Sequence, residues 1–235
     1  MERSQERIAN ALSKIEPWIS LPGDALTDIS RQCQFARYER GRQIIGHHEE
    51  PTDVFFVVSG TVRVSIHSAL GKEISYRDMG PANMFGELAA IDGEQRSASV
   101  MAHTDTVLVA MPQAVFRQAL RVYPAASEEV LKHLTCLVRL YSKRLYELRA
   151  LDVPSRVRAE LLRLANPCKG KNNTATINPI PTHSAIANRV LTRREAVARE
   201  LSKLARQGLI ERKPRTLLIR DVNALEALVR QALGE

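Results

Sequence analysis

Between residues 34 and 111 the chain is divided into short runs of β-branched and aromatic residues, and this pattern constrains the fold more than any other feature. Turn residues separate the runs, and Ser59-Gly60 and Leu70-Gly71 predict tight hairpins. Six or more short strands at such spacing are typical of a small antiparallel barrel or roll. The predicted strands are residues 43–45, 54–58, 61–66, 73–76, 97–101 and 106–110.

Helical periodicity flanks this region on both sides. Residues 6–16 and a short segment after Pro22 predict two helices before the roll, and a third runs from Pro112 to Leu120. A longer helix is predicted from about residue 125 to 151, and its apolar residues step by three and four. That spacing is the stripe of a two-stranded coiled coil, and it favours a homodimer over a helix that packs only on its own roll. The stripe consists of Leu131, Leu134, Val138, Tyr141, Leu145 and Leu148.

The last third of the chain predicts a second domain. Asp152-Val153-Pro154 is the candidate hinge, because a residue before proline disfavours helical backbone. Helix is then expected over 155–165, a polar loop or small hairpin over 166–181, and two helices joined by a short turn over 183–190 and 193–207. A basic loop at 211–215, a strand at 216–219 and a final helix at 222–233 complete the pattern. This order predicts a winged helix-turn-helix.

Charge is unevenly distributed along the chain. Residues 154–235 contain 16 Lys/Arg and 7 Asp/Glu, a net charge of +9, whereas residues 1–153 contain 18 and 19, a net charge of −1. A near-neutral domain joined to a basic one indicates that the second domain meets a polyanion. No apolar run approaches the roughly 18 residues of a membrane span, and no signal peptide is evident. The expected location is the cytoplasm, with Cys33, Cys136 and Cys168 as free thiols.

The segment from Gly80 to Ala98 carries the clearest candidate for a binding site. A glycine at 86 can open a short helix, whose unpaired N–H groups suit an anion. Arg96 can hold a phosphate by two parallel hydrogen bonds, and the Ser97 hydroxyl can add a third. Glu87 would repel a phosphate but can accept a sugar hydroxyl. Together these groups predict a site for a ribose that carries a phosphate, although a surface hairpin with an ordinary Glu87–Arg96 ion pair would also explain them.

Phe-Gly-Glu-Leu-Ala, a short gap and Arg-Ser-Ala resemble the phosphate-binding cassette of the cyclic-AMP receptor protein and Fnr superfamily of bacterial transcription regulators. The resemblance implies an α+β fold: an antiparallel β-roll of the cyclic-nucleotide-binding jelly-roll type at 1–124, a dimerisation helix and hinge at 125–152, and a winged helix-turn-helix at 153–235. It implies Glu87 on the ribose, Arg96 on the cyclic phosphate, Ser97 on phosphate or base, and a cradle shaped by Phe85, Gly86, Leu88 and Ala98.

Two further positions concern the base of the nucleotide. Tyr141 and Ser142 align with a Thr-Ser pair that reads adenine in the best-known members of the superfamily. Ser142 is identical to the serine of that pair, whereas Tyr141 stands in place of the threonine. The effector expected from the resemblance is cyclic AMP, with cyclic GMP, another nucleotide or activity without ligand as alternatives.

The second predicted helix of the basic domain would read DNA. Arg194, Glu195 and Arg199 resemble the base-reading triplet of the superfamily, and Arg and Glu can bond guanine and the amine of cytosine. As an alternative, Thr192 and Glu195 would form a capping box. Two departures weaken the motif: Leu191 replaces the usual turn glycine, and Arg189 replaces an apolar residue. Residues expected at the DNA, on bases or phosphates, are Thr182, His183, Thr192, Arg193, Arg194, Glu195, Arg199, Lys203, Arg206, Arg212, Lys213 and Arg215.

The sequence thus predicts a dimeric regulator that binds a cyclic nucleotide, double-stranded DNA with a palindromic site and RNA polymerase at the nucleoid. The alternative from another class is a regulatory subunit of a kinase or channel without DNA binding. No nucleophile elbow, Walker loop or paired catalytic carboxylates indicate an enzyme. No metal is expected, because His47 and His48 are adjacent and would point to opposite faces of a strand, so an exposed loop is preferred.

Overall fold

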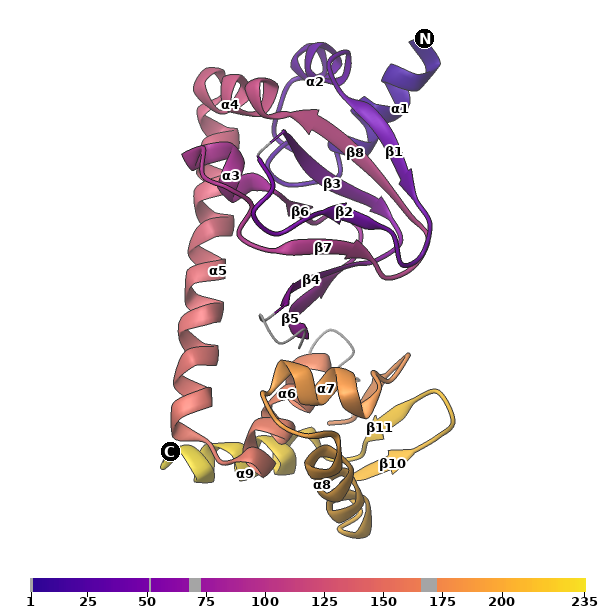
Figure 1. Ribbon diagram of the computed structural model, residues 1–235, viewed down its shortest axis with the longest axis vertical. Helices are drawn as coiled ribbons and strands as arrows, with labels where there is room; N and C mark the ends of the chain where they lie inside the picture. Colours follow the sequence, from indigo (N-terminus) through magenta and orange to yellow (C-terminus); the bar gives the residue numbers. More distant parts are fainter. Residues whose placement is uncertain (1, 51, 68–72, 166–172) are drawn as a thin grey trace. The chain divides into compact units, whose positions relative to one another are not determined.

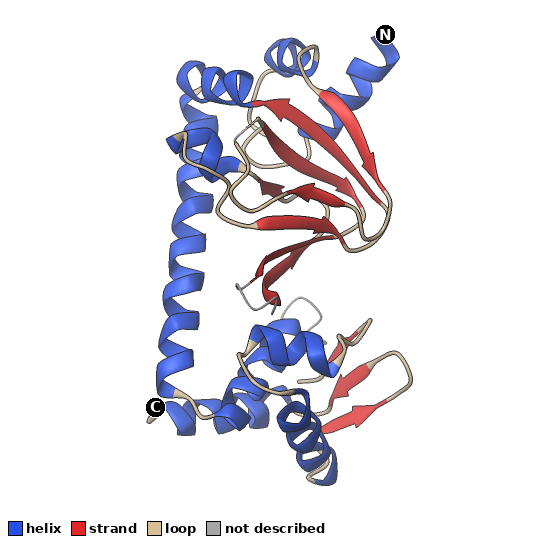
Figure 2. Cartoon of the chain, viewed as in Figure 1, coloured by secondary structure: helices blue, strands red, loops and turns tan. Residues whose placement is uncertain are grey.

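The structure, a computed structural model of the chain, describes residues 2–50, 52–67, 73–165 and 173–235. It divides into two compact units, Met1–Val138 and Arg139–Glu235, which are described one at a time. The first unit holds two four-stranded sheets and the second a three-stranded sheet, with helices in both (Figures 1 and 2). The observed class is therefore α+β, as the sequence predicts.

Antiparallel strands form both sheets of the first unit. Across each sheet, hydrogen-bonded neighbours follow one another in the order β1–β8–β3–β6 and β2–β7–β4–β5. The strands are β1 (Gln34–Tyr38), β2 (Gln43–Ile45), β3 (Asp53–Ser59), β4 (Val62–His67), β5 (Glu73–Met79), β6 (Met84–Phe85), β7 (Ser99–Ala102) and β8 (Thr106–Pro112). The sequence predicts six of these runs but does not separate β1 and β6 as strands.

The turn at Ser59-Gly60 does not close a hairpin, contrary to the prediction. β3 and β4 lie in different sheets, so the chain crosses from one sheet to the other at this point. Gly60 has φ of +86°, and a Cβ there would collide with the backbone oxygen of Asp105. The local residues therefore specify the turn but not which strands pair across it. β4 and β5 do pair with each other, while the turn predicted at Leu70-Gly71 lies outside the described residues.

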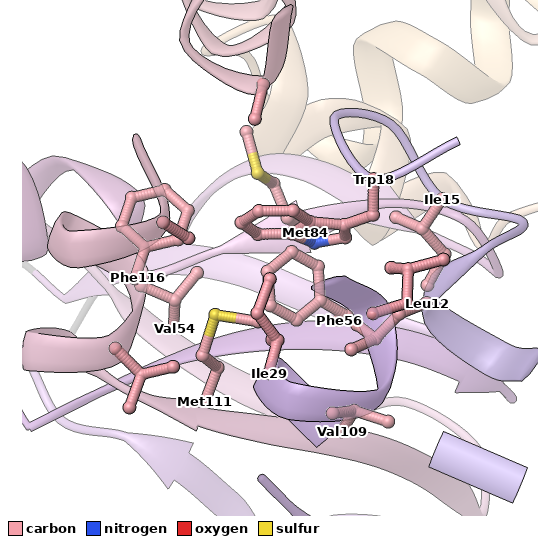
Figure 3. Packing of buried hydrophobic residues seen from close by; sticks show 14 of the residues in the cluster. Leu12, Ile15, Trp18, Ile29, Val54, Phe56, Met84, Val109, Met111 and Phe116 are labelled. Atoms are coloured by element: carbon pink, nitrogen blue, oxygen red, sulfur yellow. The ribbon is translucent and has the colours of Figure 1, made fainter. Parts of the chain in front are cut away.

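The core of the first unit is built around Trp18, which is fully buried. Its ring meets Phe56 of β3 and Phe116 edge-on, with centroid distances of 5.7 and 6.0 Å (Figure 3). Leu12 and Ile29 bring the two N-terminal helices onto the same cluster. The helices of this unit are α1 (Glu2–Leu12), α2 (Gly23–Ser30), α3 (Glu87–Asp92) and α4 (Gln113–Val122), and α5 (Pro124–Ala150) begins in it.

The long helix α5 carries two different apolar stripes. Ala126 and Val130 are buried in the core of the first unit. Leu131, Val138 and Leu145, from the predicted coiled-coil stripe, are 63, 65 and 55% exposed. One stripe therefore packs on the roll of its own chain, while the second is only partly uncovered, because its member Leu134 also packs against the core of the first unit.

The second unit contains the expected winged helix-turn-helix. A three-stranded sheet of order β10–β11–β9 packs with the helices around Leu161, Ile186 and Leu201. Strand β9 was not predicted as part of this sheet, because only a loop or hairpin was expected there. The elements are α6 (Val153–Ala165), β9 (Ala175–Ile177), α7 (His183–Arg189), α8 (Arg194–Arg206), β10 (Ile210–Arg212), β11 (Leu217–Ile219) and α9 (Val222–Leu233).

The break between α5 and α6 falls slightly earlier than the predicted hinge. Val153 and Pro154 belong to the first turn of α6, where a proline needs no N–H partner. The side chain of Asp152 accepts a hydrogen bond of 2.9 Å from the Ser155 N–H, so it caps this helix. Leu151 and Asp152 are thus the non-helical residues.

None of the helices within the described ranges is long and apolar enough to cross a membrane.

Candidate functional site

The candidate cradle begins at Gly86, the residue between β6 and α3. Gly86 has φ of +85°, a left-handed conformation that favours glycine. A Cβ at this position would lie 2.7 Å from Nη1 of Arg96 and 3.0 Å from the backbone oxygen of Asp53. The glycine is therefore required twice, for the backbone turn and for the close approach of the guanidinium.

Arg96 is buried, with 4% of its surface exposed. Its Nη1 donates to the Gly86 carbonyl at 2.9 Å, and its Nη2 donates to the Asp53 carbonyl at 2.7 Å. Burial lowers the pKa of Arg96, and the carboxylates of Asp53, Glu49 and Glu87 oppose this effect through space. A guanidinium has five N–H donors, so these two bonds fix its plane and leave donors for an anion.

Glu87, the first residue of α3, is also buried, with 4% exposed. Its carboxylate Oε1 lies 3.7 Å from Nε2 of His133 on α5. This pair replaces the simple Glu87–Arg96 surface ion pair that the sequence left open, because both cassette charges are buried and Glu87 pairs with a histidine. The dipole of α3 is expected to add little to the binding of an anion, since this helix has only six residues.

The other cassette residues surround this pair of charges. Phe85 is buried and stacks on Phe55 at 5.2 Å, which anchors the strand that leads into the cradle. Leu88 is 42% exposed and Ser97 is exposed, so both are accessible to a ligand. Ala98 is half-buried. The cassette residues thus lie together in the first unit, but Tyr141 and Ser142 fall in the second unit, and their part in the site stays a prediction.

The candidate nucleic-acid interface is the outer face of α8. Val197, Leu201 and Leu204 are fully buried and hold this helix on the core. The opposite face is polar and exposed, as an amphipathic recognition helix requires. Its exposed polar residues are Arg194, Glu195, Arg199, Ser202, Lys203 and Arg206, preceded by exposed Arg193, while Lys213 is exposed on the loop after β10.

The capping box considered for Thr192 and Glu195 is not formed. Arg193 is the N-cap residue of α8, and no side chain caps the first turn. Thr192 is half-buried, and its N–H donates to the Ala187 carbonyl at 2.9 Å. Glu195 is exposed in the first turn, so no capping bond competes with a contact to a base.

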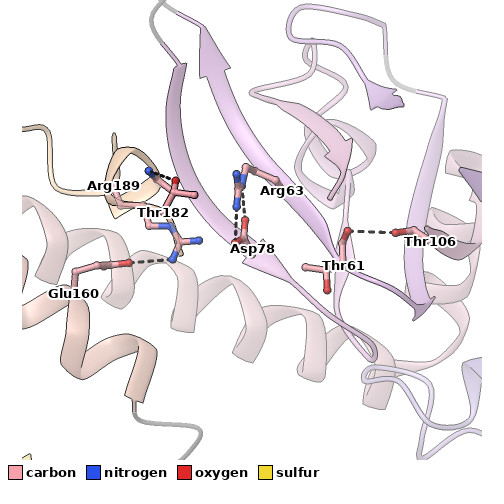
Figure 4. Close-up of polar contacts among 8 residues, drawn as sticks. Thr61, Arg63, Asp78, Thr106, Glu160, Thr182 and Arg189 are labelled. Carbon is pink, nitrogen blue, oxygen red and sulfur yellow. Dashed lines mark hydrogen bonds and ion pairs between the residues drawn. The ribbon is translucent and has the colours of Figure 1, made fainter. Parts of the chain in front are cut away.

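The two residues predicted at phosphates next to α7 have different surroundings. The Thr182 hydroxyl accepts a bond of 3.1 Å from the Ala185 N–H, so it caps α7 and stays exposed (Figure 4). Burial, then the charges of Arg212 and Arg194, lower the pKa of His183. The lowered pKa favours the neutral imidazole, which can meet a phosphate as a hydrogen-bond donor.

Arg189, which the sequence presents as a departure that weakens the motif, has a structural partner. Its Nη1 lies 3.2 Å from Oε1 of Glu160 on α6, and both side chains are buried (Figure 4). Glu160 also bonds Arg163 at 2.9 Å, and Arg163 bonds Glu147 of α5 at 2.8 Å. This buried charge network joins the end of α5, α6 and α7, so Arg189 replaces an apolar contact by an ionic one.

A second ionic contact fixes the recognition helix. Glu200 on the buried face of α8 bonds Arg158 of α6 at 2.6 Å. Sequence reasoning missed this pair and the charge network, because charged residues in helices are usually taken as solvent-exposed. The only sequence signal was position: Glu200 falls on the apolar stripe between Val197 and Leu201.

Metal and thiol chemistry receive no support from the described residues. No group of three or more His, Cys, Asp or Glu side chains there could hold a metal ion. His47 and His48 lie in a turn rather than a strand, and their rings stack at 3.6 Å instead of pointing to opposite faces. Burial, then Asp53, raises the pKa of the Cys33 thiol to about 12, which keeps it unreactive. Cys136 is free, and Cys168 lies outside the described residues.

The chain is similar to known proteins over most of its length. Residues 35–123 match the family model of the Cyclic nucleotide-binding domain, and residues 155–228 match the Crp-like helix-turn-helix domain. The CRP-like cAMP-activated global transcriptional regulator of Mycobacterium tuberculosis is 30% identical over 202 residues, which are 86% of this chain and 90% of that protein.

Solved structures share the fold. A CooA variant from Carboxydothermus hydrogenoformans has a TM-score of 0.74 at 23% identity, covering 89% of this chain and 91% of that chain. The c-di-GMP responsive global regulator CLP from Xanthomonas campestris has a TM-score of 0.67 at 18% identity, covering 84% and 99%.

The two domain matches decide between the predicted classes. A helix-turn-helix domain beside the roll excludes the alternative of a kinase or channel subunit without DNA binding. The matched relatives are transcription regulators, not enzymes. The chain belongs to the CRP/FNR family of cyclic-nucleotide-binding, DNA-binding transcription regulators.

Proposed function

We propose that the protein is a homodimeric regulator that binds cyclic AMP in the cradle and, in response, a palindromic DNA site. The observation that carries this proposal is the buried guanidinium of Arg96, whose two hydrogen bonds go to the neutral carbonyls of Gly86 and Asp53. A buried cation without a directly bonded carboxylate favours an anionic ligand.

In this proposal each cassette residue has a separate role. Arg96 binds the cyclic phosphate, Ser97 adds a hydroxyl to phosphate or base, and Glu87 accepts the ribose hydroxyl. Gly86 and Ala98 give the ligand room because neither has a long side chain. Phe85 and Leu88 form apolar walls, and Tyr141 and Ser142 of α5 contact the base.

Cyclic AMP is the first candidate because the Mycobacterium tuberculosis relative carries that effector in its name. The position of Tyr141 keeps other bases open, since an aromatic ring can stack on any of them. The name of the Xanthomonas campestris neighbour adds c-di-GMP to the ligands worth testing beside cyclic GMP.

The homodimer is supported by the uncovered stripe of α5. Leu131, Val138 and Leu145 recur at intervals of seven and are more than half exposed, and such a stripe is buried when two helices pair. Tyr141, 39% exposed, lies between them. Pairing would set the two recognition helices about 34 Å apart, one turn of DNA.

Arg194, Glu195 and Arg199 read base edges in this proposal, while Thr182, His183, Thr192, Arg193, Lys203 and Lys213 contact the backbone. The nucleotide acts through its preference for the arrangement in which both helices are in register. Bound at its sites on the nucleoid, the dimer would contact RNA polymerase.

The testing experiment is selection of DNA from a random double-stranded pool by the full-length protein. It is performed without nucleotide and with cyclic AMP, cyclic GMP or c-di-GMP. We expect cyclic AMP to enrich a palindrome whose half-sites lie about one helical turn apart. Arg194→Ala should weaken the sequence preference at one base pair in each half-site, with a loss of about 1–3 kcal/mol in discrimination between bases.

Lys203→Ala is the matched control, because an exposed phosphate contact weakens all sequences uniformly. Enrichment that is equal with and without every nucleotide would mean that the protein acts without ligand. Enrichment of no sequence under any condition would contradict the proposal as a whole.

A further inference from the structure

His133 lies on the stripe of α5 that faces the roll of its own chain. The buried residues Ala126, Val130 and Leu137 are spaced around it by three, four and seven positions. It is a polar residue on an apolar stripe, and its side chain is only 26% exposed. Such a position needs a polar partner inside the unit.

That partner is Glu87, although the contact is incomplete. Nε2 of His133 is buried and has no hydrogen-bond partner, while the nearest Glu87 oxygen, Oε1, is 3.7 Å away. An N–H···O bond forms at about 2.7–3.2 Å, so the two atoms would have to approach by about 0.5–1 Å to complete it. A buried donor left unpaired is costly, and this cost favours closure.

A cavity lies next to His133. It has a volume of about 170 Å³ and is lined by Glu16, Ala82, Asn83, Met84, Glu129 and His133. Glu129 is already bonded to Lys132 at 2.8 Å, so Lys132 partly neutralises the charge nearest to the ring on its own helix. Glu87 is the acidic group that His133 contacts directly.

We propose that His133 is the positioning residue for ribose recognition. Its Nε2–H donates to Oε1 of Glu87 when nucleotide is bound, which leaves the second carboxylate oxygen to accept the ribose 2′-hydroxyl. This inference rests on the proposed function of the cradle. A carboxylate held at one oxygen presents the other in a fixed direction, and a directed acceptor discriminates better than a mobile one.

The arrangement also connects the ligand to the dimer helix. His133 is two residues from Leu131, an exposed member of the coiled-coil stripe. If His133 and Glu87 formed their hydrogen bond, α5 would move toward the cassette near Leu131. Ribose binding and helix position are therefore coupled through one hydrogen bond.

The test compares cyclic AMP with 2′-deoxy cyclic AMP, which lacks only the hydroxyl that Glu87 would accept. Titration calorimetry of the full chain gives both affinities. For the wild type we expect about a tenfold preference or more for cyclic AMP, the value of one hydrogen bond to a charged group. His133→Ala should reduce this preference by about threefold or more and leave the affinity for the deoxy analogue within about twofold.

Three further variants sharpen the result. His133→Leu removes the donor while keeping volume and serves if the alanine variant does not fold, and His133→Gln, which keeps an N–H donor, should retain part of the preference. Glu129→Ala, from the same cavity, should leave the preference unchanged. In a Glu87→Gln background, which removes the charged acceptor, His133→Ala should have little further effect.

The outcomes separate the inference from the function beneath it. If the wild type binds neither nucleotide, the proposed function fails and this inference with it. If it binds both equally, Glu87 does not take the hydroxyl. If His133→Ala and His133→Leu weaken both nucleotides by the same factor, or neither, His133 is only a packing residue and the positioning role is wrong.

Discussion

The cradle and the charge network each hold an arginine, the buried Arg96 and the half-buried Arg163, and the two have different surroundings. Arg96 donates to backbone carbonyls, and burial lowers its pKa. For Arg163, burial also acts to lower the pKa, but the carboxylates of Glu160 and Glu147 outweigh it, and the pKa rises. The Arg163 guanidinium is neutralised by carboxylates that it bonds directly, whereas Arg96 bonds carbonyls and meets the carboxylates of Asp53, Glu49 and Glu87 only through space.

This difference distinguishes Arg96, the proposed binding arginine, from a structural one without reference to any relative. Arg189, like Arg163, bonds a buried carboxylate and therefore belongs to the structural class. The pattern agrees with the cassette resemblance for Arg96 and explains why Arg189 can replace an apolar residue in α7. We expect substitutions in the two regions to affect different quantities: stability in the second unit and ligand affinity in the first.

The largest effect is expected from Glu160→Ala. Glu160 is buried and bonds both Arg189 and Arg163, so its removal leaves two guanidinium groups without their shared partner. Loss of one partner of a buried ion pair costs about 3–5 kcal/mol in unfolding free energy. Urea unfolding followed by circular dichroism measures this change, while fluorescence of Trp18, the single tryptophan, follows the first unit.

Glu211→Ala is the control, because Glu211 bonds Arg220 at 2.7 Å on the exposed surface and should change stability little. Nucleotide affinity should be unaffected in both variants. If Glu160→Ala leaves the unfolding curve where it was, the network does not support the second unit, and the distinction between the two kinds of arginine is lost.

The next effect is expected at Arg96. Arg96→Ala should reduce nucleotide affinity by about 2–5 kcal/mol, roughly 30-fold to several thousand-fold, because a buried phosphate loses its counter-charge. Arg96→Lys keeps the charge without the planar fork and should fall between the alanine variant and the wild type. Calorimetric titration with cyclic AMP measures all three.

Arg37→Ala, at an exposed arginine on β1, is the matched control and should bind nucleotide normally. An Arg96→Ala variant with wild-type affinity would show that the buried guanidinium only ties Gly86 to Asp53. Arg96 would then belong to the structural class together with Arg189.

The sequence predicted much of both regions, and the parts that it missed share one physical cause. Local patterns identified the roll, the long helix and the winged helix-turn-helix, because these depend on residues close together in the chain, but they did not predict the left-handed backbone at Gly86. They placed a hairpin at Ser59-Gly60 that does not exist, since strand partners are chosen by the whole fold. The contacts of Glu87 with His133 and of Glu160 with Arg189 join segments far apart in sequence, and no periodicity encodes them.

The smallest effect is expected at Leu191, the second departure from the family pattern. Leu191 replaces the usual turn glycine, and the structure has φ of +50° at this leucine, which is 43% exposed. Arg189 is compensated by Glu160, whereas Leu191 keeps a left-handed backbone that favours glycine. Glycine relieves about 1–2 kcal/mol of left-handed strain and loses about 0.5–1 kcal/mol through the flexibility of the unfolded chain.

Leu191→Gly should therefore raise the unfolding free energy by about 1 kcal/mol or less, measured by urea unfolding. Leu191→Ala removes most of the side chain but keeps the left-handed backbone strain, so it should not raise the unfolding free energy. Comparison of the two variants therefore isolates the contribution of the backbone. A clear loss of stability in the glycine variant would mean that the leucine side chain holds the turn. Leu191 would then be compensated as Arg189 is, and the two departures would follow one rule, in which each replaced residue brings its own contact.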